Sequence, residues 1–238
     1  MRASLARVRN AVGIFVTCSE LLDGPDLFDL LCSRQYSALT LASTLIFKRF
    51  VCCALAQIFA CMHIIRLFFP GLEHNDLHTG NIFSTGAASH LIILELAPLI
   101  ALIIPLVFTH WLELRVADFG AADAPSLDIR RPERFPAASD RQVLAGDELP
   151  ELVTRLAPYH SVEENPQFWR EVSDVLDSVA PAATHAPGDP NGFLTCLKEL
   201  GCFAWMRVDA RDNAVDAWCK ANDVKYRSDL VRRVRLYE

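Results

Sequence analysis

Long basic runs are absent from this sequence, and their absence argues against one class of partner. The longest basic runs are two residues, as at Arg130-Arg131 and Arg232-Arg233, and the formal net charge is −6. Nonspecific binding to nucleic acid requires Lys and Arg side chains that neutralise phosphates. We therefore expect no nucleic-acid partner, whereas a small nucleotide ligand stays compatible with the composition.

Paired cysteine motifs and a secretory leader are also lacking. None of the eight cysteines forms a C-x-x-C pair, and no basic-then-apolar signal peptide precedes them. This pattern favours reduced thiols in a cytoplasmic compartment and disfavours structural zinc. The eight are Cys18, Cys32, Cys52, Cys53, Cys61, Cys196, Cys202 and Cys219.

Internal repeats and low-complexity arrays are missing as well, so the chain is expected to fold around its own core. It has 238 residues, of which 52% are hydrophobic and 22% charged. That size and composition suit one large domain and exclude a disordered protein.

Two short motifs carry the chemistry. The first is His74-Asn75-Asp76-Leu77-His78-Thr79-Gly80-Asn81, and the second is Asp118-Phe119-Gly120. Together they offer a carboxylate and an amide five residues apart, then a second carboxylate beside a glycine. These are the hard oxygen ligands that Mg²⁺ and phosphate chemistry use, so the motifs indicate phosphoryl transfer.

The two motifs resemble the H-x-D-x-x-x-x-N catalytic loop and the Asp-Phe-Gly element of protein kinases. The segment Asp-Leu-His-Thr-Gly-Asn-Ile is most similar to the same loop in the divergent kinases of large DNA viruses and in the haspin-like group. The resemblance implies an α+β, mostly helical fold, a kinase-like C-terminal lobe. It also implies transfer of the ATP γ-phosphate to a Ser or Thr hydroxyl of a protein substrate, with ATP and Mg²⁺ as cofactors.

The resemblance gives each loop residue a role. Asp76 would accept or orient the proton of the attacking hydroxyl, while Asn81 and Asp118 would hold the Mg²⁺ ions. His78 stands where these kinases usually have Lys, and it would touch the transferred phosphate as a cation or as a neutral N–H donor. His74 would be structural and would bond backbone near Asp118.

The glycines of the two motifs have expected roles too. Gly80 would permit a tight turn in the loop, and Gly120 would permit backbone motion after the metal ligand.

Upstream of the loop, the order of elements also follows the resemblance. Residues 12–18 predict a strand, and a linker after it leads to a helix over 26–31 with Asp26 at its N-terminus. This resembles a kinase hinge, in which backbone near Glu20 and Leu22 would meet adenine. Residues 44–69 predict a buried core helix that Pro70-Gly71 ends.

The chain departs from the kinase pattern at its beginning. The 19 residues upstream of Glu20 contain no Lys, no acidic residue and a single glycine, Gly13. The Gly-rich loop, the strand Lys and its Glu partner therefore cannot lie there, and we expect most of the N-terminal lobe to be missing. Two readings stay open: a phosphotransferase, or a catalytically inactive kinase-derived binding module or truncated product.

The second departure is a long connection between the two motifs. Asp118 follows Asp76 by 42 residues, which is more than twice the usual length of this connection in kinase-like proteins. The additional residues form an apolar stretch over 91–112, with Glu95 as its only charge. A stretch of 22 residues is long enough to span a membrane, but a span would place Asn81 and Asp118 on opposite sides. We favour an inserted β-rich hairpin or buried helix, or a translated intervening sequence, so a membrane anchor is possible but not favoured.

Beyond Gly120 the kinase pattern fades, and an A-P-E element is lacking. One helix is predicted to begin in residues 140–146 and to continue into 149–156. Residues 168–179 predict a second helix, because their apolar residues fall on one face. Two or three further helices are predicted over 193–206 and 212–237. The chain 1–238 is thus one partial domain, with 12–25 as the last N-lobe strand and hinge, 26–120 as the C-lobe and 121–238 as divergent helices.

Overall fold

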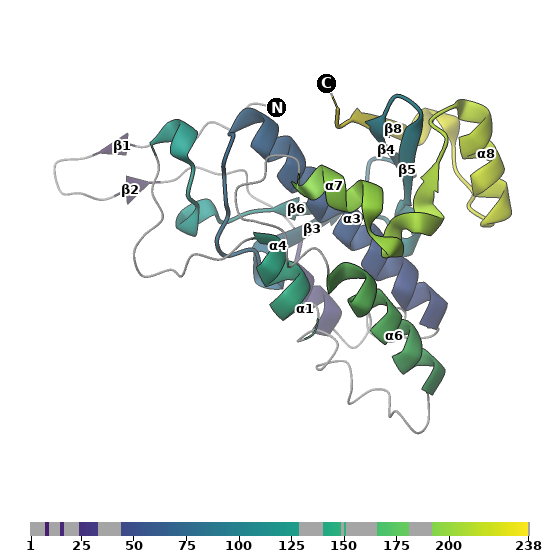
Figure 1. Cartoon of the computed structure of the whole chain (residues 1–238), viewed down its shortest axis with the longest axis horizontal. Coiled ribbons are helices and arrows are strands. Elements are labelled where there is room, and N and C mark those ends of the chain that lie inside the picture. The colour runs from purple at the N-terminus through teal and green to yellow at the C-terminus, as the bar shows by residue number, and fades with distance from the viewer. Residues whose placement is uncertain are drawn as a thin grey trace.

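The fold is α+β, as the sequence predicts, and its described residues form helices and three small sheets (Figure 1). The computed structural model describes residues 8–9, 15–16, 24–32, 44–128, 140–148, 150, 166–180 and 192–237.

Helix α3, Thr44–Phe68, is the central helix of the structure. Its side chains from Phe50 to Met62 are almost all buried, and the helix ends before Pro70 and Gly71, where Gly71 has a φ of 77°. Residues 48–68 are long and apolar enough to cross a membrane, but 78% of their most apolar window is buried inside the fold. The prediction of a buried core helix is therefore confirmed.

The described residues near the N-terminus include part of the predicted strand and the predicted helix. Strands β1, Val8–Arg9, and β2, Phe15–Val16, pair antiparallel. Helix α1, Leu27–Cys32, begins where predicted, and the Asp29 N–H donates to the Asp26 carboxylate at 2.7 Å. Asp26 thus caps the first turn. Glu20 and Leu22, the expected adenine contacts, lie outside the described residues.

The apolar stretch over 91–112 forms a β-hairpin inserted between two paired strands. Strand β3, Ile82–Gly86, pairs antiparallel with β6, Leu112–Val116. Between them lie β4, Leu91–Ala97, and β5, Ile100–Pro105, which pair with each other, and the turn η2, Leu106–Thr109. The hairpin alternative is confirmed, and a transmembrane helix over 91–112 is wrong.

This hairpin is the centre of a four-stranded sheet with the order β7-β5-β4-β8. Its odd-numbered residues, such as Ile93 and Ile103, pack with α8, whereas Ile92 and Ile104 pack in the main core with α3. Figure 1 shows β4, β5 and β8 gathered beside α8. A strand buried on both faces needs apolar residues at every position, which explains why the stretch is as hydrophobic as a membrane span.

The C-terminal segment corrects one prediction. Helix α8, Asp212–Ala221, is present, but Val231–Arg235 forms strand β8, parallel to β4, and not a helix. Val231 packs beside α8, while Val234 packs on the main core, so the two faces alternate as in a strand. Helix α3 holds the end of β8 in place, because His63 Nε2 donates to the Leu236 carbonyl at 2.8 Å.

The other helices lie around α3. They are α4, Asp140–Gln142, continued by the π-helical segment Val143–Glu148, then α6, Pro166–Val179, α7, Gly192–Glu199, and the 3-10 helix Gly201–Met206, which leads into β7, Arg207–Val208. Shorter 3-10 turns are Thr79–Asn81, Phe119–Ala121, Pro125–Leu127 and Ser228–Leu230.

Helix α6 follows the predicted amphipathic pattern where its side chains are described. Val175 and Val179 are buried in the main core, and Leu176 packs against it. The side chains of Phe168, Trp169 and Val172, and residues 151–156, lie outside the described part of the chain.

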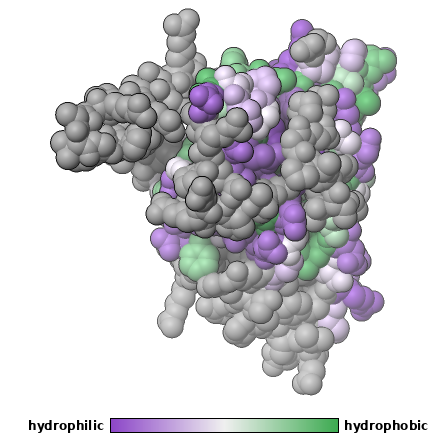
Figure 2. Space-filling model, turned by 60° about the vertical axis from the view of Figure 1, so that its left-hand side comes forward, coloured by the Kyte–Doolittle hydropathy of each residue, from purple (hydrophilic) through white to green (hydrophobic). Residues whose placement is uncertain are grey.

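On the face drawn in Figure 2, hydrophilic and hydrophobic residues lie interspersed over the coloured part of the surface. The exposed large hydrophobic side chains of the whole described chain are Leu67, Phe68, Leu99, Ile100, Val107, Trp111 and Leu127.

Candidate functional site

The pairing of β3 with β6 brings the two sequence motifs together. Asn81 directly precedes β3, and Asp118 follows β6 by two residues, so both lie at the same end of this antiparallel pair. The Ala117 N–H donates to the Asn81 carbonyl at 2.9 Å. The hairpin leaves from the opposite end of the pair, and its length therefore does not separate the motifs.

His74 links the loop to the second motif. Its Nε2 donates to the Ala117 carbonyl at 2.8 Å, and its ring lies 4.7 Å from the ring of Phe119. Burial lowers the pKa of His74 below its ordinary value, which favours the neutral ring. His74 is therefore a structural residue beside Asp118, in the place where the sequence predicts it.

Asp76 and Asn81 are hydrogen-bonded to each other within the loop. The Asn81 Nδ2 donates to the Asp76 carbonyl at 2.8 Å and to its carboxylate at 3.3 Å. These bonds orient the amide, so that Oδ1 is the Asn81 atom suited to bind a cation. The Asp76 side chain is 36% exposed and can meet a substrate from solvent.

His78 is held by the glycine two residues later. The Gly80 N–H donates to His78 Nδ1 at 3.0 Å, which places the proton of the neutral ring on Nε2. That Nε2 lies 3.7 Å from the Asp76 carboxylate. A Cβ at Gly80 would lie 2.9 Å from the His78 ring, so the ring, and not a positive φ, requires glycine here.

Asp118 and Gly120 repeat the same arrangement. The Gly120 N–H donates to Asp118 Oδ1 at 3.2 Å, and a Cβ at Gly120 would lie 3.1 Å from that oxygen. Asp118 is exposed and has a left-handed φ of 54°, a conformation that Asp and Asn adopt more readily than most residues. The predicted metal ligand is thus presented to solvent by a local turn.

The donor set fits magnesium. Asn81 offers an amide oxygen and Asp118 a carboxylate, and Mg²⁺ in nucleotide sites commonly takes one or two protein oxygens together with phosphates and water. Among the described residues, no three or more His, Cys, Asp or Glu side chains gather as a metal site. Such a cluster is not what a nucleotide-bound ion needs.

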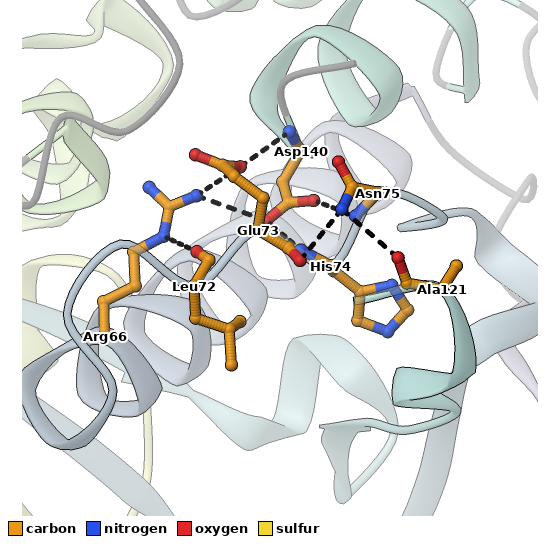
Figure 3. A network of polar contacts seen from close by, with 7 residues as sticks. All are labelled: Arg66, Leu72, Glu73, His74, Asn75, Ala121 and Asp140. Atoms are coloured by element: carbon orange, nitrogen blue, oxygen red, sulfur yellow. Dashed lines mark hydrogen bonds and ion pairs between the residues drawn. The ribbon is translucent and has the colours of Figure 1, made fainter. Parts of the chain in front are cut away.

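A buried ionic network contacts the backbone of the loop, and the sequence did not predict it (Figure 3). The Asp140 carboxylate accepts the backbone N–H groups of His74 at 2.9 Å and of Asn75 at 2.8 Å. Arg66 contacts both carboxylates of the network, at 2.6 Å to Glu73 and 3.2 Å to Asp140. Its Nε also donates to the Leu72 carbonyl at 2.8 Å.

This network fixes the backbone that leads into Asp76. Asn75 has a φ of 61°, and its side chain donates to the Glu73 carbonyl at 3.3 Å and to the Ala121 carbonyl at 3.2 Å. Burial, with Glu73 as a second cause, raises the pKa of Asp140 to about 7. A carboxyl buried next to another carboxylate disfavours its charged form even though Arg66 is close.

Glu148 is a second residue that the sequence did not single out. One oxygen of its carboxylate, Oε2, accepts the Thr79 N–H at 2.9 Å and the Thr79 hydroxyl at 3.0 Å. The only sequence signal for Asp140 and Glu148 is a pair of acidic residues in a short helical segment, which is common on any surface.

Comparisons with known proteins identify no relative of this chain: no protein-family model, no curated protein and no solved structure matches it.

Proposed function

We propose that this chain is a kinase-like phosphotransferase that moves the γ-phosphate of ATP to a Ser or Thr hydroxyl of a protein. The observation that carries the proposal is the meeting of the two motifs. The β3–β6 pair and the Ala117–Asn81 bond set the loop that holds Asp76 and Asn81 beside Asp118. A base and two metal ligands at one end of a strand pair are the parts that phosphoryl transfer needs.

In this proposal each side chain acts from the place described. Asp76, partly exposed, orients the attacking hydroxyl and takes its proton. His78 presents Nε2 on the same side as the Asp76 carboxylate, while its Nδ1 accepts the Gly80 N–H. Asn81 and Asp118 would hold Mg²⁺, which when bound neutralises charge on the nucleotide phosphates.

A second candidate function is a binding module without transfer. The observation that favours it is His78, which stands in the loop where the resemblance places a Lys and whose Nδ1 accepts the Gly80 N–H. A cation on the phosphates contributes a large share of the rate in this chemistry. Nucleotide binding without transfer is the behaviour expected of such a module.

The first experiment is calorimetry with Mg²⁺-ATP on the purified chain and on Asp118→Asn. The variant keeps an oxygen that can accept the Gly120 N–H, so the turn is preserved while one charge is lost. Asp128→Asn is the matched control, because Asp128 also has a left-handed φ, of 53°, and is exposed in a later turn. We expect binding in the wild type and in Asp128→Asn, and at least about tenfold weaker binding in Asp118→Asn.

A transfer assay then separates the two candidates. Radiolabelled ATP is supplied with a pool of Ser- and Thr-containing peptides, and Asp76→Asn is compared with the wild type. Transfer by the wild type that Asp76→Asn loses supports the enzyme. Binding without transfer favours the module, and a wild type that binds no Mg²⁺-ATP refutes both nucleotide functions.

A further inference from the structure

We propose that Glu148 is a positioning residue for the loop that carries Asp76, a role that rests on the proposed phosphoryl transfer. Glu148 Oε2 accepts two bonds from one residue, the N–H of Thr79 at 2.9 Å and its hydroxyl at 3.0 Å. Thr79 is buried and begins the 3-10 turn Thr79–Asn81. The carboxylate therefore fixes the start of the turn that presents Asn81.

The same segment fixes the loop on the other side of Asp76. Asp140, eight residues before Glu148, accepts the N–H groups of His74 and Asn75 at 2.9 and 2.8 Å. The segment 140–148 is thus bonded to the loop both before and after Asp76. Two carboxylates on one segment define the path of the backbone that carries the base.

The character of these bonds explains why the position of Asp76 depends on them. Both bonds of Glu148 end on the same oxygen, so loss of this one side chain would leave two donors of the loop without their acceptor. Small misplacements of a catalytic group lower rates steeply, by about a hundredfold for a shift of about 1 Å. Glu148 bonds Thr79 and not Asp76 or Asn81, so it acts through the loop and not on reacting atoms.

The bonding pattern also predicts which substitutions are tolerated. Glu148→Gln keeps one oxygen that can accept both donors, and Thr79→Ser keeps both donors. Glu148→Ala removes the acceptor, and Thr79→Val removes the hydroxyl but keeps the N–H. Asp147→Ala is the matched control, because Asp147 is exposed and lies next to Glu148 in the sequence. This substitution also removes one carboxylate but leaves the contact with Thr79 intact.

The experiment measures the initial rate of phosphate transfer from ATP to the peptide pool, together with the KM for ATP. Rates are taken well below the thermal transition of each variant and are normalised to the folded fraction. For Glu148→Ala we expect a loss of about tenfold to a hundredfold in rate at saturating ATP, with KM changed by less than about threefold. Glu148→Gln and Thr79→Ser should retain most of the rate.

Thr79→Val should lose less than Glu148→Ala, and the double variant should lose no more than Glu148→Ala alone, because both changes break one contact. An active wild type with an unimpaired Glu148→Ala overturns the role of Glu148 only. An equal loss in Asp147→Ala overturns it too, since the effect would then be one of charge and not of position. A wild type that transfers no phosphate overturns the proposed function and this role with it.

Discussion

The substitution Asp140→Ala tests whether a buried carboxylate holds the loop. The wild-type side chain is fully buried and accepts the N–H groups of His74 and Asn75, besides its contact with Arg66. Alanine removes the acceptor from both N–H groups at once. Arg66 keeps its 2.6 Å contact with Glu73, so the loss centres on the loop backbone.

The expected magnitude follows from those two donors. Leaving a buried donor without an acceptor costs about 1–3 kcal/mol, and two donors give about 2–6 kcal/mol before relaxation. Removing one of two neighbouring carboxylates offsets part of this, because the repulsion between Asp140 and Glu73 disappears. We therefore expect Asp140→Ala to lower the free energy of unfolding by about 2–4 kcal/mol.

Urea denaturation followed by circular dichroism at pH 8 measures this change. With an m-value of about 1–3 kcal/mol/M, the midpoint should fall by roughly 1 M or more. The matched control is Asp177→Ala, which removes an exposed carboxylate from helix α6 and should stay within about 0.5 kcal/mol of the wild type. If Asp140→Ala matches Asp177→Ala, the network does not hold the loop and the reasoning fails.

Two further predictions address the hairpin and the pH dependence of stability. Ile103 and Ile104 lie on opposite faces of β5, and both side chains are fully buried. Ile103→Ala and Ile104→Ala should therefore each lower the free energy of unfolding, measured in urea, by about 2–5 kcal/mol. A small effect of one substitution would mean that only one face of the strand is packed. Because the pKa of Asp140 is raised to about 7, the folded chain retains a proton that the unfolded chain releases near pH 4. The free energy of unfolding of the wild type, relative to Asp140→Asn, should therefore fall between about pH 4 and pH 7, and parallel curves for the two proteins would contradict the raised pKa.

Elements that depend on local sequence could be predicted. An apolar run ended by Pro70 and Gly71 gave helix α3, and Asp26 marked the start of α1. The hairpin stayed ambiguous, because burial on both faces removes the alternation that identifies a strand. Strand β8 was missed because its arginines pair with Glu95 and Glu113, more than a hundred residues earlier in the chain.

The candidate site divides in the same way. Both motifs are contiguous in sequence, and the structure brings them to one end of the β3–β6 pair. Asp140 and Glu148 bond to the loop from 65 to 69 residues away, mainly through backbone N–H groups. Every residue has such a group, so no side-chain pattern could mark these contacts in advance.

The parallel pairing of β4 with β8 affects how the chain can fold during synthesis. Leu91 pairs with Val231, so β4 leaves the ribosome long before its partner strand exists. Until then both edges of the hairpin are open and its face against α8 is uncovered, which are features that promote aggregation. Loss of β8 should therefore lower the yield of folded protein, because the edge of β4 would stay unpaired.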